Sequence, residues 1–112
     1  MADRLLVQKT TITDATGATC MTGVSGDSQT VLSISICETG NADETFSLLH
    51  TVSGGGSGFY IYIDQTLPAK STFIHSDKIV VDDTNQLWVK AGGTANIDVI
   101  VTYLQQDDLW LA

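Results

Sequence analysis

Basic residues, proline and long hydrophobic runs are all scarce in this chain of 112 residues. Lysine and arginine number 5 against 13 acidic residues, so the formal net charge is −8 and the chain lacks the positive surface that attracts phosphate. No stretch approaches the roughly 18 consecutive apolar residues of a membrane-spanning helix. The sequence therefore predicts no nucleic-acid partner and no membrane partner.

Signals for export and for disulfide bonding are also weak. The apolar run near the N-terminus is Leu5–Val7, whereas a secretory signal needs about seven or more apolar residues. Cys20 and Cys37 are the two cysteines, and they lie too far apart in sequence for a Cys-x-x-Cys site. We therefore expect no signal peptide, synthesis in a cytoplasm, and two buried thiols rather than a disulfide.

The residues that are abundant are those of strands and turns. The chain holds 15 Thr, 9 Val and 9 Ile together with 10 Gly and 9 Ser, while 11 of its 13 acidic residues are Asp. β-Branched residues favour strands, and Gly, Ser and Asp favour turns, whereas the residues that build soluble helices are few. This composition excludes a helical bundle and predicts an all-β protein.

Alternation of apolar and polar residues locates the strands, because successive side chains in a strand point to opposite faces. Turn signals separate these segments at short intervals, as in a sandwich. We predict a single antiparallel β-sandwich domain over residues 1–112, of jelly-roll or immunoglobulin-like type with about eight strands. It would have a short N-terminal arm and an apolar C-terminal tail (105–112). The strongest candidate strands are 5–13, 29–38, 44–51, 59–64 and 96–104, with a hairpin formed by 78–81 and 86–90.

Residues that carry chemistry are few and do not form a known motif. His50 continues the apolar face of Phe46 and Leu48, which favours a core histidine. His75-Ser76-Asp77 contains the residue types of a catalytic triad, but adjacent residues on a strand face opposite ways, so we expect a surface turn. We therefore predict no enzyme activity, no catalytic residues and no cofactor.

A calcium site is the one metal site that the sequence leaves open. Asp82, Asp83 and Asn85 offer oxygen ligands within one loop, but they lack the spacing of a known calcium loop. Asp and Asn are also standard turn residues, which favours a solvated turn. Two Cys and two His show no spacing for a transition metal, so we predict no such site.

Aromatic and apolar residues give the candidate binding surfaces. If Phe59, Ile61 and Ile63 face the core, Tyr60 and Tyr62 point outward, and the same alternation turns Trp88 outward. Three outward aromatic side chains would form a patch for a protein or, by stacking, for a sugar, and the alternative is that loops fold over these strands and cover both faces. The tail contributes Leu109, Trp110 and Leu111, which either dock on a neighbouring subunit or pack on their own domain.

The order of these segments resembles the small β-sandwich virion proteins of tailed bacteriophages. The residues that carry the resemblance are the Thr-rich strand 9–13, the segment 29–41, Leu67-Pro68-Ala69-Lys70, Lys78-Ile79-Val80-Val81, Gln86-Leu87-Trp88-Val89-Lys90-Ala91 and the strand 97–104. The chain departs from that pattern at Lys70, where Gly is more usual, and in the extra residues after Tyr103. The match covers roughly residues 9–104 and contains no catalytic signature.

The resemblance implies a non-enzymatic role in a virion, as a capsid decoration (cement) protein or as a neck, tail or baseplate component. It also implies a homo-oligomer, such as a trimer, and contacts with the major capsid protein or tail proteins. Two alternatives remain open. One is a carbohydrate-binding module that stacks host glycans on Tyr60, Tyr62 and Trp88, and the other is a small hydrolase that uses a histidine.

Overall fold

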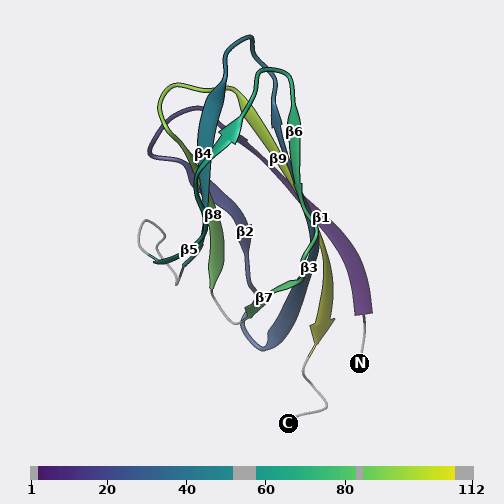
Figure 1. Cartoon of the computed structure of the whole chain (residues 1–112). Helices are drawn as coiled ribbons and strands as arrows, with labels where there is room; N and C mark the ends of the chain where they lie inside the picture. Colours follow the sequence, from purple (N-terminus) through teal and green to yellow (C-terminus); the bar gives the residue numbers. More distant parts are fainter. Residues whose placement is uncertain (1–2, 52–57, 83–84, 108–112) are drawn as a thin grey trace.

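The computed structural model describes residues 3–51, 58–82 and 85–107, and among these it contains strands and no helix. The strands form two antiparallel sheets that pack face to face, so the predicted all-β sandwich is confirmed (Figure 1). The strands are β1 (Asp3–Ile12), β2 (Ala18–Thr22), β3 (Asp27–Glu38), β4 (Glu44–Thr51), β5 (Gly58–Leu67), β6 (Thr72–His75), β7 (Ile79–Asp82), β8 (Gln86–Ala91) and β9 (Ile97–Asp107).

The order of the strands within the sheets identifies the type of sandwich. Sheet A has the order β1-β9-β3-β6, with β7 also paired to β3, and sheet B has the order β2-β8-β4-β5. The pairs β1–β9, β2–β8, β3–β6/β7 and β4–β5 are nested from the two ends of the chain toward its middle. This nesting is the pattern of a jelly roll and not of an immunoglobulin-like sandwich.

The nine strands correspond to the eight of a jelly roll because one strand is interrupted. Strand β6 pairs with the second half of β3, at Ile34–Cys37, and β7 pairs with its first half, at Ser28–Val31. Residues 76–78 separate the two pieces. The expectation of about eight strands thus matches the topology, with one strand divided into β6 and β7.

The core lies between the sheets and follows the predicted alternation. On β9, Ile97, Val99 and Val101 face inward, and on β4 the inward residues are Phe46 and Leu48. On β3 the alternation is shifted, because a bulge between Val31 and Ser33 leaves Leu32 half-buried and places Val31 in the core. The remaining buried core residues are Ile12, Cys20, Met21, Ile34, Ile36, Leu67, Val81, Leu87, Val89, Ala91, Ala95 and Tyr103.

The predicted hairpin of residues 78–81 and 86–90 is wrong. Strand β7 pairs with β3 in sheet A, whereas β8 lies between β2 and β4 in sheet B. The chain therefore crosses from one sheet to the other after Asp82, and Val81 and Leu87 enter the core from opposite sides. A short polar turn between two alternating segments looks the same in sequence for a hairpin and for such a crossing.

The two ends of the described chain run side by side at the edge of sheet A (Figure 1). Strand β1 pairs with β9 along its whole length, from Asp3 opposite Gln106 to Ile12 opposite Ile97. Strand β9 continues through Asp107, so residues 105–107, which we assigned to the tail, belong to the sheet. The predicted tail residues Leu109, Trp110 and Leu111, together with the glycine-rich segment 54–57 and Asp83, lie outside the described residues.

Candidate interaction surfaces

The outer face of sheet A exposes apolar side chains on four strands. The pairing of the strands places Leu5, Leu104, Thr30 and Val80 in one row across β1, β9, β3 and β7. A second row contains Lys9, Ile100, Ser35 and Ile74. We call this surface the apolar face; its apolar members are Leu5 (71% exposed), Val7 (51%), Ile74 (57%), Val80 (56%), Ile100 (40%) and the half-buried Leu104.

Small hydroxyl side chains lie between these apolar residues. Thr30, Ser33 and Ser35 occupy the central strand β3, and Thr102 of β9 lies opposite Ser33. Threonine is the largest of these side chains. The centre of the face is therefore lined by smaller side chains than the apolar residues that surround it. Clustered apolar surface of this kind marks a protein-interaction site more often than a site of chemistry.

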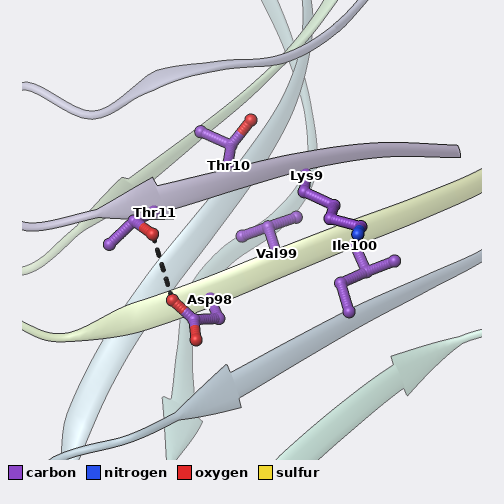
Figure 2. Close-up of a pocket in the computed structure, with 6 residues that line it drawn as sticks. All are labelled: Lys9, Thr10, Thr11, Asp98, Val99 and Ile100. Carbon is purple, nitrogen blue, oxygen red and sulfur yellow. Dashed lines mark hydrogen bonds between the residues drawn. The ribbon is translucent and has the colours of Figure 1, made fainter.

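A shallow depression of about 300 Å³ lies at one end of the apolar face, along β1 and β9. Figure 2 shows its lining, in which the Thr11 hydroxyl donates to a carboxylate oxygen of Asp98 at 3.1 Å. The rest of the lining is Lys9, Thr10, Val99 and Ile100, so the depression holds one amine and one carboxylate. Within the described residues no group of three or more His, Cys, Asp or Glu is placed to hold a metal ion.

The outer face of sheet B carries two of the three predicted aromatic side chains. Trp88 of β8 lies opposite Leu49 of β4, and Leu49 lies opposite Tyr60 of β5, so the three form a row across the sheet. Trp88 is half-buried and its indole N–H donates to the carbonyl oxygen of Thr16 at 3.1 Å. The ammonium group of Lys90 lies 5.4 Å from the centre of the Tyr60 ring, within the range of a cation–π contact.

The prediction that Tyr62 points outward is wrong. Strand β5 carries a bulge, because Leu48 pairs with Tyr62 and the next residue, Leu49, pairs with Tyr60. Ile61 is the extra residue, so Tyr60 and Tyr62 face opposite sides of the sheet although they are two positions apart. Tyr62 packs inward against Phe46 and Phe73, with ring centres 6.2 and 4.9 Å away.

Of the three predicted inward residues of β5, Ile61 alone packs against the core. Phe59 is 83% exposed and Ile63 is 65% exposed, while Ile61 is partly buried against the core. At Asp64 the backbone adopts a φ of 47°, and its N–H donates to the Ser47 hydroxyl at 3.0 Å. Strand β5 is therefore irregular at two places, and simple alternation does not describe it.

Each histidine is held by a hydrogen bond within the fold. Nε2 of His50 donates to the carbonyl oxygen of Val80 at 3.0 Å and so links sheet B to β7 of sheet A. His75 is buried rather than on a surface turn, and its Nδ1 lies 2.8 Å from the Tyr62 hydroxyl. The contact between His75 of β6 and Tyr62 of β5 joins the edges of the two sheets. The sequence around His75 does not predict this contact, because Tyr62 comes from another strand.

A buried carboxylate that the sequence reading missed supports a strained turn. Glu38 is 1% exposed and accepts the backbone N–H of Gly40 at 2.7 and 3.0 Å. It also accepts the N–H of Lys70 at 3.4 Å, and Lys70 has a φ of 59° at the third position of the turn Pro68–Ser71. Glycine is the usual residue there, which agrees with the departure seen in the sequence.

The two cysteines are free, as predicted, but they differ in environment. Cys20 lies in the core, and burial raises the pKa of its thiol to about 12. Cys37 is half-buried and lies opposite Asp98 and Thr72 on the outer side of sheet A. The prediction of two buried thiols thus holds fully for Cys20 only.

Comparison with known proteins supports the fold and supplies no family. No protein-family model and no curated protein sequence matches the chain. A structure of Bacillus endospore appendages, described as disulfide-linked pili, is similar with a TM-score of 0.53 and 13% identity, covering 96% of this chain and 91% of that one. A chain from the acidic stable capsid of Helicobacter pylori bacteriophage KHP30 has a TM-score of 0.52 and 11% identity, covering 93% and 92%.

These two similarities show a shared fold over almost the whole length of each chain. The described residues contain no helix long and apolar enough to cross a membrane.

Proposed function

We propose that this chain is a non-enzymatic structural protein of a tailed-phage virion that assembles with copies of itself and with other virion proteins. The observation that carries the proposal is the apolar face, where Leu5, Ile74 and Val80 are each more than half exposed on three different strands. The fold is shared with a chain of a phage capsid and with a pilus structure, both of which are parts of large assemblies.

The physical basis of this assembly is the burial of apolar surface. Removing apolar area from water contributes about 25 cal/mol per Å², and a stable interface buries roughly 1,600 Å² in total. A face that spans β1, β9, β3, β6 and β7 is suited to such a contact, because its apolar side chains are already exposed. The partner would be the major capsid protein in a decoration role, or a tail, neck or baseplate protein.

The histidine contacts support a non-enzymatic role. The His50 ring donates to a backbone carbonyl, and the His75 ring is buried beside Tyr62. Neither ring reaches a Ser or Cys side chain through a hydrogen bond in the described part of the chain. This arrangement gives no support to the hydrolase alternative.

The test compares two matched substitutions of exposed apolar residues. Ile100→Asp lies on the apolar face and Val24→Asp lies in the loop after β2, and the two residues are 40% and 44% exposed. We expect light scattering to show an oligomer for the wild type and for Val24→Asp, and a smaller species for Ile100→Asp with an unchanged circular dichroism spectrum. We also expect the wild type to co-purify with phage particles. A wild type that stays monomeric at high concentration and never associates with particles would contradict the proposal.

Glycan binding is the second candidate, and the row of Trp88, Leu49 and Tyr60 is the observation that favours it. Aromatic rings on a sheet face can stack on sugars. However, Trp88 already uses its N–H within the chain, and Lys90 lies over the Tyr60 ring. A glycan array and a titration of tryptophan fluorescence decide this question, with Trp88→Ala and Tyr60→Ala as the variants that should abolish any response.

A further inference from the structure

The four edges of the two sheets differ in how well they are protected against pairing with another chain. In sheet B, β2 has five residues and a register shift, and β5 has bulges and the left-handed residue Asp64. In sheet A, the edge opposite β1 is divided into β6 and β7, which have four residues each. Short, bulged and broken strands are the usual protection of sheet edges.

Strand β1 has none of these backbone protections, and its charged residues are Asp3, Arg4 and Lys9. It is ten residues long and keeps an uninterrupted register with β9 from Asp3 to Ile12. It contains no proline, and no strand of the described residues pairs with its other side, which carries the N–H and C=O groups of an edge. Its first half is also exposed, since Leu5 and Val7 are 71% and 51% exposed.

We propose that β1 pairs antiparallel with β1 of a second copy of this chain, about a two-fold axis that passes beside Leu6. This pairing joins the two copies of sheet A into one continuous sheet, and it places the two apolar faces side by side on the same side of that sheet. The inference deepens the proposed assembly role and rests on it. It names the partner as a second copy and the contact as residues 3–9 of each chain.

The sequence of β1 is complementary to itself in this register. Residues whose numbers sum to 12 lie opposite one another, so Asp3 lies opposite Lys9 of the partner subunit and Leu5 lies opposite Val7 of the partner subunit. Leu6 lies opposite Leu6 of the partner subunit. Opposite charges and apolar pairs across neighbouring strands each contribute roughly 0.2–1 kcal/mol. Because of the two-fold symmetry, the Asp3–Lys9 and Leu5–Val7 pairs each occur twice.

The neighbouring registers lose this complementarity. With the axis beside Val7, Leu5 lies opposite Lys9 of the partner subunit and Asp3 lies opposite its Thr11. With the axis beside Leu5, Asp3 lies opposite Val7 of the partner subunit and Arg4 lies opposite its Leu6. Each shift sets a charged side chain against an apolar one, so the register centred on Leu6 is favoured.

The first experiment is disulfide crosslinking of the full chain. Cysteine is introduced as Leu6→Cys in a Cys37→Ser background, since Cys37 is the half-exposed native thiol and Cys20 is buried. Opposed residues on antiparallel strands have Cβ atoms about 4.5–5.5 Å apart, close enough for a disulfide after a small adjustment. We expect a crosslinked dimer under mild oxidation, and none for the control Thr11→Cys, which lies on the same strand outside the paired segment.

The second experiment is a charge-reversal cycle followed by light scattering at about 150 mM salt, where the Debye length is roughly 8 Å. Asp3→Lys and Lys9→Asp should each raise the dimer dissociation constant by about tenfold, because each turns two attractive pairs into two repulsive ones. The double variant Asp3→Lys/Lys9→Asp restores the pairs and should regain wild-type association. Within one chain the two residues are roughly 20 Å apart, so they do not compensate each other there.

The outcomes separate this inference from the proposed function. An oligomer that persists while Leu6→Cys fails to crosslink and the reversals have no effect would overturn the β1 contact and leave the assembly role standing. A wild type that light scattering shows only as monomer and trimer would also overturn it, because a two-fold contact cannot close a three-fold ring. A wild type that neither self-associates nor joins particles would overturn both.

Discussion

Glu38 shows how a single buried carboxylate can fix two loops. Its oxygens accept N–H groups from Gly40 and from Lys70, which lie in loops after β3 and after β5. Hydrogen bonds to a charged group contribute about 1.5–3 kcal/mol. We expect Glu38→Ala to lower the free energy of unfolding by about 2–3 kcal/mol in urea denaturation. The other glutamate, Glu44, is less buried and provides the control, and an equal loss for Glu44→Ala would contradict this role.

The backbone conformation of Lys70 also affects the free energy of unfolding. Its φ of 59° is a left-handed conformation that glycine adopts without a steric penalty. We expect Lys70→Gly to raise the free energy of unfolding by about 0.5–1 kcal/mol, measured by urea denaturation. Lys78→Gly removes the same charge from another exposed loop position outside the left-handed region, and it should be neutral or destabilising.

Cys20 should make the stability depend on alkaline pH. Burial raises the pKa of its thiol from 9.0 to about 12, so above pH 9 the unfolded chain loses this proton while the folded chain keeps it. The stability that the neutral thiol contributes is complete below this range and is lost as the pH rises toward 12. The loss amounts to about 1.4 kcal/mol per pH unit within the range.

The measurement is urea denaturation at several pH values between 8 and 11 for the wild type and for Cys20→Ala. We expect a steeper decrease for the wild type, because all other ionisable groups are the same in both proteins. Parallel curves would show that the thiol does not contribute. The absolute stability of Cys20→Ala is not the readout, since the substitution also removes packed volume from the core.

At the scale of the secondary-structure elements, the bulge of β5 decides which tyrosine is structural. Tyr62 is directed inward and its hydroxyl bonds to His75, whereas Tyr60 remains on the outer face. We expect Tyr62→Phe to lower the free energy of unfolding by about 1 kcal/mol, since it removes a hydrogen bond to a buried histidine. Tyr60→Phe should change it by less than about 0.5 kcal/mol. The reverse order in thermal denaturation would contradict the assignment of the two faces.

Regular strands could be predicted from the sequence, and irregular ones could not. The inward faces of β4 and β9 follow from alternation, because both strands keep a period of two through most of their length. Each of these strands also lies between two neighbouring strands of its sheet. The face of Tyr62 depends on an extra residue in β5 relative to β4, which is a property of the pair and not of either segment. The β7–β8 crossing and the burial of His75 depend likewise on partners that are distant in sequence.

At the scale of the whole molecule, the jelly-roll order places the ends of the chain together at one edge. The pairing of β1 with β9 brings Asp3 beside Gln106, so the N-terminal strand and the last described strand form a single ribbon (Figure 1). Composition predicts a sandwich, but it does not determine this nested order, because local alternation does not specify which strands pair. Among the described strands, this order leaves β1 as the one long regular edge and extends the apolar face across the whole of sheet A, and these are the two surfaces proposed for assembly.

The residues that follow this ribbon include three large apolar side chains. Leu109, Trp110 and Leu111 are outside the described residues, and β9 ends at Asp107. The core residues of the described chain extend no further than Tyr103. We therefore expect deletion of residues 109–112 to change the melting temperature by less than about 4 °C and to weaken self-association and binding to particles.

Circular dichroism melting and light scattering on the same samples provide the measurement. A variant of full length with Leu109→Ser, Trp110→Ser and Leu111→Ser controls for the loss of chain length, and it should behave like the deletion because the apolar side chains are the proposed contact. If the truncated chain unfolds, these residues pack on their own domain and the docking hypothesis is wrong. If it stays folded and assembles as the wild type does, assembly depends on the apolar face and the β1 edge without them.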